Sequence, residues 1–314
     1  MDEKTKPEAK LSTEAYKGVR DFYPEDMAIQ NYIFDTWKKV SKDAGFVEYS
    51  ASILEPAELY RAKSGEELVN EQMFTFTDKG DREVALRPEM TPSFARMVAA
   101  KRKSLKFPLK WFSIPNLFRY ERPQRGRKRE HWQLNCDIVG IADLNADAEI
   151  ISLAYKIMKA FGAKNEEFQI CINDRVLLNE KFNSPELIKL LDRKEKMEPA
   201  EFSQKWMEIS GKEYDDNIEP NETIKELLNK LESEGVKNVI FAPTVTRGFD
   251  YYTGMVFEVF DTHPDNKRSL FGGGRYDNLL EIFGVEPVPT VGFGMGDITM
   301  RDFLETHSLP TCEK

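Results

Sequence analysis

Residues 116–140 read NLFRYERPQRGRKREHWQLNCDIVG, and this stretch is the most informative part of the chain. On either side of the polar loop PQRGRKREH, the segments 109–123 and 132–141 are rich in the residue types of β-strands. Two strands joined by a loop of this length predict an antiparallel pair. The stretch therefore indicates a sheet whose connecting loop is strongly basic.

Four polar residues of this stretch are placed to face a ligand. Alternation along a strand should put Arg119 and Glu121 on one face, and Gln133 and Asp137 on a shared face of the return strand. Runs of charge are most often solvated surface, and composition alone favours that interpretation. Four polar groups on one sheet surface, however, need a ligand or each other, and guanidinium groups bind phosphate and carboxylate in a bidentate manner.

The rest of the chain predicts strand pairs interrupted by helices. Helices are expected over 24–46, 91–104 and 145–161, strands over 46–54, 73–78, 83–89, 168–174, 238–243, 247–261 and 269–277, and a glycine-rich strand followed by a helix over 288–305. The Gly-Asp between 73–78 and 83–89 predicts a hairpin. The fold class is α+β around an antiparallel sheet, not a doubly wound parallel sheet.

Four segments are expected along the chain. They are a flexible N-terminal tail over 1–17, the first part of a core over 18–174, a helical insertion over 175–234 and the second part of the core over 235–314. The insertion is rich in Lys, Glu and Leu and poor in β-branched residues, which favours helices.

Composition narrows the class of function. The 314 residues can bury a core with a real cleft, which leaves room for an enzyme. No run of about 18 apolar residues occurs, and the charged N-terminus does not resemble a secretory signal, so we expect a cytoplasmic protein without a membrane span. A net charge of −9 argues against coating of nucleic acid by bulk attraction, although residues 119–129 form a local basic patch.

Cysteine and histidine are too few for several kinds of site. The three cysteines, Cys136, Cys171 and Cys312, are far apart and predict neither a metal-ligand pair nor a disulfide framework. With three histidines in the chain, a zinc cluster is not expected and a histidine-dependent triad has few candidates.

The stretch 116–140 resembles motif 2 of the class II aminoacyl-tRNA synthetases, in the form typical of the histidyl-tRNA synthetase family. The resemblance implies that Arg119 contacts the ATP α-phosphate and the substrate carboxylate, that Glu121 and Arg127 hold ATP, that Gln133 and Asp137 hold histidine, and that Gln124, Arg125 and Arg129 meet the acceptor end of tRNA(His). The family usually has Glu at the position of Asp137. Adenylation brings a carboxylate to a phosphate, so arginines and the Mg²⁺ that accompanies ATP must neutralise charge, and no enzyme nucleophile is required.

Three further segments resemble the same family. RGFDYYTGMVFE over 247–258 implies a catalytic Arg247 near the α-phosphate, with Tyr251 and Tyr252 in the histidine pocket, although packed aromatics at a strand entry is the more ordinary interpretation. GGGRYDNLL over 272–280 implies Tyr276 in the pocket, and its glycines would also suit a hairpin turn. LRPEMTPSFAR over 86–96 implies that Glu89 binds the substrate amino group with help from Thr91, which would otherwise be a helix N-cap.

Two motifs depart from the family. At the place of motif 3, the family has an arginine where this chain has Thr299. Arg301 lies two residues later, which is about 200° around a helix, so it should not replace that arginine. In motif 1, which forms the dimer interface in the family, the usual proline falls at Ser52, and Pro56 follows four residues later; a homodimer is still expected.

The resemblance covers residues 18–305 and implies a histidine–tRNA ligase that uses ATP, L-histidine and tRNA(His). The family continues after motif 3 into a C-terminal anticodon-binding domain, and this sequence ends shortly after that motif. Two alternatives remain. One is the synthetase-like regulatory subunit of ATP phosphoribosyltransferase, which shares the fold without catalysis, and the other is a tRNA-binding module without chemistry.

Overall fold

The computed structural model describes residues 11–62, 64–65, 68–194, 197–215, 217–246, 251–266 and 269–312. Most of the tail expected over 1–17 therefore lies outside the described residues. Arg247, expected to be catalytic, lies outside them too.

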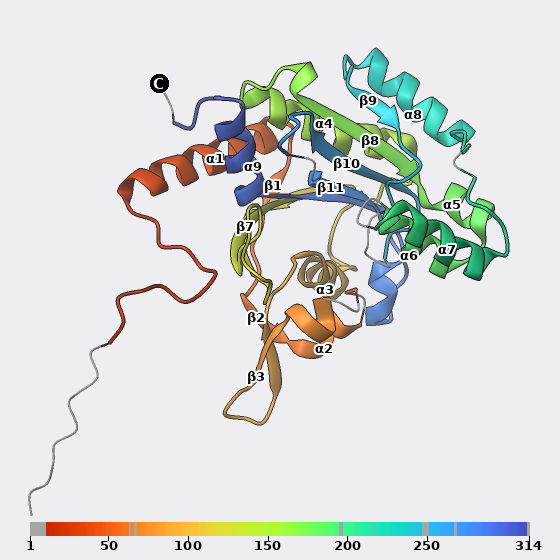
Figure 1. Ribbon diagram of the computed structural model, residues 1–314. Helices are drawn as coiled ribbons and strands as arrows, with labels where there is room; N and C mark the ends of the chain where they lie inside the picture. The colour runs from red at the N-terminus through yellow and green to blue at the C-terminus, as the bar shows by residue number, and fades with distance from the viewer. Residues whose placement is uncertain are drawn as a thin grey trace, which may run out of the picture.

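A nine-stranded sheet forms the centre of the molecule (Figure 1). Its strands run in the order β1-β5-β7-β12-β11-β10-β8-β9, and β6 pairs with β7. Their bounds are β1 Val47–Glu48, β5 Leu109–Ser113, β6 Asn116–Phe118, β7 Glu130–Val139, β8 Phe168–Asp174, β9 Val239–Phe241, β10 Met255–Asp261, β11 Ser269–Arg275 and β12 Thr290–Gly296. Only the pairs β1/β5 and β8/β9 are parallel, so the expected antiparallel α+β sheet is confirmed.

Four helices cover one face of this sheet: α1 Pro24–Asp43, α4 Leu144–Ala160, α8 Glu222–Ser233 and α9 Asp297–Thr306. Their apolar side chains join those of the sheet in the main core, which includes Trp37, Ile150 and Phe303. The helix starts follow local rules, since Pro24 occupies the first turn of α1 and the side chain of Asp143 accepts from the backbone N–H of Asn145 to cap α4. None of the helices in the described part of the chain has the length and apolarity that a membrane span requires.

The opposite face of the sheet is partly covered by α3 Thr91–Lys101 and by a small sheet of order β2-β4-β3. The bounds there are β2 Leu54–Pro56, α2 Ala57–Arg61, β3 Phe74–Thr77 and β4 Glu83–Leu86, with a single π-helical turn over Leu68–Gln72. β3 and β4 are the expected hairpin, and the carboxylate of Asp78 closes its turn by accepting from the N–H groups of Gly80 and Arg82.

The described part of residues 175–234 forms four helices, and they do not pack as one unit. Helices α5 Arg175–Phe182, α6 Pro185–Asp192 and α7 Pro199–Ser210 share a separate apolar cluster, which includes Leu191 and Trp206. Helix α8 instead packs on α4, and its Ile224, Leu227 and Leu231 are buried in the main core. We call α5–α7 the helical block; it lies at one end of the sheet in Figure 1.

Three expected strands differ most from the structure. The strand expected over 109–123 divides into β5 and β6, because Pro115 has no N–H for the sheet, and β6 ends at Phe118. The one expected over 46–54 gives only β1 and the first residue of β2. In the segment 247–261, β10 begins at Met255, so Tyr251 and Tyr252 precede the strand.

Candidate functional site

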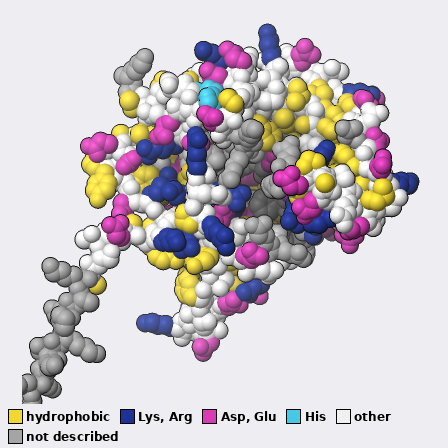
Figure 2. Space-filling model, in the orientation of Figure 1, with side chains coloured by type: hydrophobic (Ala, Val, Ile, Leu, Met, Phe, Trp, Pro, Cys, Tyr) yellow, Lys and Arg dark blue, Asp and Glu magenta, His cyan; other side chains and the backbone are white. Residues whose placement is uncertain are grey.

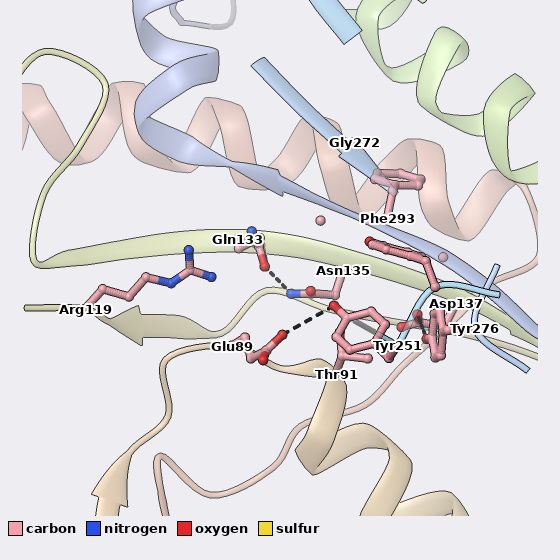
Figure 3. A pocket seen from close by; sticks show the side chains of 13 residues that line it. Glu89, Thr91, Arg119, Gln133, Asn135, Asp137, Tyr251, Gly272, Tyr276 and Phe293 are labelled. Carbon is pink, nitrogen blue, oxygen red and sulfur yellow. Dashed lines mark hydrogen bonds between the residues drawn. The ribbon is translucent and has the colours of Figure 1, made fainter. Parts of the chain in front are cut away.

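A small cavity lies on the sheet face opposite the four large helices, and Figure 3 shows the side chains that surround it. It is lined by Glu89, Thr91, Arg119, Gln133, Asn135, Asp137, Tyr251, Tyr252, Gly272, Tyr276, Gly292, Phe293 and Gly294. All seven residues expected to hold histidine are among these, together with Arg119. Five separate segments of the sequence therefore meet at one place.

Strand β7 supplies three polar side chains to the cavity. Gln133, Asn135 and Asp137 alternate onto the same face, as the sequence predicts for Gln133 and Asp137. Strand β12 lies beside them and places Gly294 opposite Asn135 and Gly292 opposite Asp137. A β-carbon at Gly292 would overlap the Asp137 carboxylate, and one at Gly294 would lie 2.7 Å from Cδ of Gln133. The glycines of motif 3 thus make room for the polar groups of motif 2.

Asp137 is the most deeply placed of these groups. Only 5% of its surface is exposed, and its carboxylate accepts a hydrogen bond from the hydroxyl of Tyr276. Burial raises the pKa of Asp137 to about 7, because desolvation disfavours the charged form, and the bond from Tyr276 offsets only part of this. The carboxyl can therefore change its charge near neutral pH.

Glu89 occupies the nearby wall, in the segment between β4 and α3. Its carboxylate accepts from the hydroxyl of Ser64 at 2.5 Å and from that of Tyr251 at 3.4 Å. Burial raises the pKa of Glu89, while Ser64, the charge of Arg119 and Tyr251 act in the opposite direction. Thr91 also lines the cavity, but it is the first residue of α3 and not its N-cap, which is Met90.

Arg119 and Glu121 lie beyond the end of β6, so the expectation that both are in a strand is wrong. The N–H of Glu121 donates to the carbonyl of Arg119 at 2.7 Å, and this tight turn breaks the pairing with β7. Arg119 still lines the cavity, because its Nε donates to the carbonyl of Pro88 at 2.8 Å and fixes the direction of the guanidinium. Glu121 instead pairs with Arg127, with 3.3 Å between Oε2 and Nη1.

The basic loop is folded back on itself. Gln124 and Arg127 exchange backbone hydrogen bonds of 3.0 and 3.1 Å, and Gly126 takes the positive φ of 76° that this turn requires. The side chain of Arg125 extends from the loop to α9, where it forms an ion pair with Asp302.

Arg129 is not available to a large ligand in this conformation. It is buried, with 8% exposed, and its guanidinium lies 3.8 Å from the ring centroid of Tyr120 and 5.5 Å from that of Tyr16. Its backbone N–H donates to the carbonyl of Gly18. The position of Arg129 does not support a contact with tRNA and indicates that it anchors the N-terminal segment to the loop; Tyr16, expected in a mobile tail, is part of that anchor.

A second cavity, of about 1190 Å³, lies between the basic loop, α9 and the helical block. Its lining includes Gln124, Arg125, Arg127, Asp192, Thr246, Glu258, Asp265, Ser269, Leu270, Thr299 and Asp302. Lys and Arg side chains gather beside the central hollow of the face shown in Figure 2. The strand β11 borders both cavities, because Gly272 lines the small one and Leu270 the large one.

The chain is held firmly just before residue 247. Asn173, fully buried at the end of β8, donates through Nδ2 to the carbonyls of Pro243 and Val245 at 3.0 and 2.9 Å. Thr246 donates to the carboxylate of Asp192 in α6 at 2.7 Å. The segment that leads to Arg247 is thus fixed to the sheet and to the helical block.

The arrangement on α9 agrees with the sequence-based argument about motif 3. The hydroxyl of Thr299 donates to the carbonyls of Leu270 and Gly296, and the side chain lines the large cavity. Arg301 points elsewhere, because its guanidinium binds Asp26 of α1 and Glu305 of its own helix. Arg301 therefore does not stand in for an arginine at 299.

Sequence reasoning missed Asn135 and the glycines of β12. Asn135 could have been found, because it alternates onto the same face of β7 as Gln133 and Asp137. The need for glycine at 292 and 294 depends on which strand lies next to β7, and a single sequence does not reveal that pairing. The glycines at 272–274, which would also suit a hairpin turn, lie inside β11.

Comparison with known proteins points to one family. The family model described as histidyl-tRNA synthetase matches residues 18–208 and 175–297. A histidine–tRNA ligase of Leptospira biflexa is 47% identical over 96% of this chain and 76% of its own length, and one of Thermoplasma volcanium is 39% identical over 95% and 76%. A crystal structure described as an ATP phosphoribosyltransferase regulatory subunit/histidyl-tRNA synthetase from Bacillus halodurans C has a TM-score of 0.78 at 24% identity, over 95% of this chain and 83% of that one. The last of these likenesses concerns the fold alone.

Proposed function

The chain belongs to the histidyl-tRNA synthetase family, and we propose that it acts as a histidine–tRNA ligase, which activates L-histidine with ATP and passes the histidyl group to the 3′ end of tRNA(His). One observation carries the proposal: the small cavity brings Arg119, Glu89 and Asp137 together around a space bordered by tyrosines. Arg119 is a cation that suits a carboxylate or phosphate, Glu89 is an anion that suits an ammonium group, and Asp137 is an acceptor for an imidazole N–H.

In this proposal the chain works by positioning and neutralisation. Glu89 binds the α-ammonium group, while Asp137, oriented by Tyr276, accepts from the imidazole ring. Arg119 holds the substrate carboxylate next to the α-phosphate, so that two anions can approach one another. The carboxylate oxygen attacks phosphorus, pyrophosphate leaves, and no side chain forms a covalent bond.

The large cavity is the proposed nucleotide site. Arg127 lines it from the basic loop and pairs with Glu121, and the motif 2 resemblance implies that both residues hold ATP. The Mg²⁺ that accompanies ATP would take carboxylate ligands, and Glu258 in the lining is of that type. Gln124 lines the same cavity and remains the predicted contact with the tRNA acceptor end. The compartment that suits this reaction is the cytoplasm.

The regulatory-subunit alternative has less support. The Leptospira and Thermoplasma relatives are both named as ligases, at 47% and 39% identity. The Bacillus structure, whose description includes both roles, supports the fold only. The polar groups of the small cavity are those that the reaction needs, which also disfavours a tRNA-binding module without chemistry.

A homodimer is part of the proposal. β1 is an edge strand of the central sheet, and Val47 on it is 63% exposed. Leu54 on β2 and Phe76 on β3 are also exposed apolar side chains near motif 1. Sedimentation equilibrium should give twice the chain mass, and Val47→Asp with Leu54→Asp should give one chain mass; a wild-type monomer would remove the dimer from the proposal.

Histidine-dependent ATP–pyrophosphate exchange tests the activation step directly. Purified protein should exchange label only when histidine is present. Arg247→Ala should lower the rate by orders of magnitude with little change in Tm, because the role proposed for Arg247 is electrostatic and not one of packing. If the wild type shows no exchange but stimulates a phosphoribosyltransferase, the ligase proposal is lost.

A further inference from the structure

Arg125 spans the gap between the basic loop and α9. Its Nε donates to both carboxylate oxygens of Asp302, at 2.9 and 3.2 Å, and its Nη2 donates to the hydroxyl of Thr306 at 3.4 Å. Spacings of three and four residues put Thr299, Asp302 and Thr306 on one face of the helix. The guanidinium therefore lies on the same face of α9 that Thr299 presents to the large cavity.

The positive charge at that face of α9 comes from Arg125 of the basic loop. Within α9, Arg301 is the one Lys or Arg, and it is turned to Asp26 and Glu305. Thr299 is neutral, and its hydroxyl already donates to two backbone carbonyls. Arg125 is thus the cation placed beside this part of the cavity.

The described lining of the large cavity holds two cations, Arg125 and Arg127, against the four carboxylates of Asp192, Glu258, Asp265 and Asp302. A ligand with several negative charges needs both arginines, and the carboxylates other than Asp302 suit a divalent cation that accompanies it. A metal-bound triphosphate matches this pattern of charge.

Both arginines are held by bonds that a phosphate can replace. The side chain of Arg125 is 61% exposed and that of Arg127 is 49% exposed, and ion pairs at such exposure contribute little. A phosphate offers the same forked guanidinium a bidentate partner with more charge than one carboxylate. Exchange of Asp302 for a phosphate is therefore favourable once the nucleotide is bound.

We propose that Arg125 binds the β- and γ-phosphates of ATP during histidine activation, and that it leaves Asp302 to do so. This inference rests on the proposed function and deepens it. It gives Arg125 a role in the first half-reaction, in addition to the contact with tRNA that the motif implies. The ordinary alternative is that the Arg125–Asp302 pair merely ties the loop to α9.

The test is histidine-dependent ATP–pyrophosphate exchange in the absence of tRNA. Arg125→Ala should raise KM for ATP and for pyrophosphate about tenfold or more, as expected for loss of one charge-assisted bidentate contact, and leave KM for histidine within about twofold. The KM for ATP of Arg125→Lys should lie between those of the wild type and Arg125→Ala. Arg122→Ala, an exposed arginine of the same loop, is the matched control and should leave KM for ATP unchanged.

Asp302→Asn separates phosphate binding from loop anchoring. If Arg125 serves ATP, freeing it from Asp302 should leave KM for ATP unchanged or lower it. A rise equal to that of Arg125→Ala would mean that the pair only anchors the loop, and it would overturn the inference. So would an unchanged KM for ATP in Arg125→Ala together with a loss of tRNA charging. Absence of exchange in the wild type would instead refute the proposed function.

Discussion

Asp137 is the residue whose chemistry depends most on its burial. Its pKa of about 7 in the folded protein lies above the unfolded value of about 3.9, so the folded chain retains a proton that the unfolded chain releases. Its contribution to stability is therefore intact below about pH 4 and is lost progressively as pH rises toward 7. Asp137→Asn should raise Tm at pH 8 and have little effect at pH 4. A change in Tm that is the same at both pH values would contradict this cause.

The same carboxyl should govern binding of the amino acid. Asp137 accepts from an imidazole N–H best when ionised, so kcat/KM for histidine should rise with pH through about 7. Asp137→Asn should lose that inflection and keep the one near 6.5 that belongs to the imidazole of free histidine. Exchange rates measured from pH 5.5 to 8.5 provide the comparison, and an unaltered profile in the variant would point to another group.

Asn135 should contribute to the affinity for histidine. It lines the cavity, and its Nδ2 donates to the carbonyl of Gln133, which leaves Oδ1 as an acceptor for the ligand. Asn135→Leu keeps the size but removes the polar group, and we expect KM for histidine to rise about tenfold with KM for ATP unchanged, as for one lost buried hydrogen bond. Gln124→Ala, outside the small cavity, is the control for KM of histidine. Equal KM values in Asn135→Leu and wild type would exclude the contact.

For single residues, the sequence predicted the positions of the pocket residues better than those of the basic loop. Alternation along one strand was enough to place Gln133 and Asp137 together, because β7 is long and regular. The same rule failed at Glu121, because the turn at Arg119 breaks the strand. The burial of Arg129 was not foreseeable, since it depends on Gly18 and Tyr16, more than a hundred residues earlier.

At the scale of the element, β12 shapes the site by lacking side chains. Gly292→Ala would press a methyl group against the Asp137 carboxylate and the carbonyl of Cys136, both of which belong to the neighbouring strand. We expect a loss of stability of about 1–3 kcal/mol, as for overpacking, and a large loss of affinity for histidine. Gly296→Ala, in the same strand, meets only the hydroxyl of Thr299 at 3.5 Å and is the control. Thermal melts and histidine titration should separate the two, and equal behaviour would contradict the packing argument.

Most elements could be predicted because their patterns are local. The hairpin of β3 and β4, the helix α4, and the strand β12 followed by α9 all appear where periodicity and turn residues place them. The predictions of elements that failed share a cause. Whether β5 and β6 are one strand, or whether α8 belongs to the insertion, is decided by partners that are distant in the sequence.

At the scale of the whole molecule, the helical block and the main core should respond separately to cavities. Trp206 is buried in the cluster of α5–α7, whereas Leu227 of α8 is buried in the main core with α4 and β8. Either change to Ala should cost about 2–5 kcal/mol where the side chain packs. Trp206→Ala should therefore speed amide exchange in α5–α7 and leave β8, β10 and β12 protected, because its cluster does not extend into the sheet. Leu227→Ala should lower the Tm of the chain and speed exchange in those strands.

Since Thr246 binds Asp192 at the end of α6, loosening of the helical block in Trp206→Ala should also reach residues 243–246 and slow histidine activation. Faster exchange in β12 after Trp206→Ala would show instead that the two clusters unfold together.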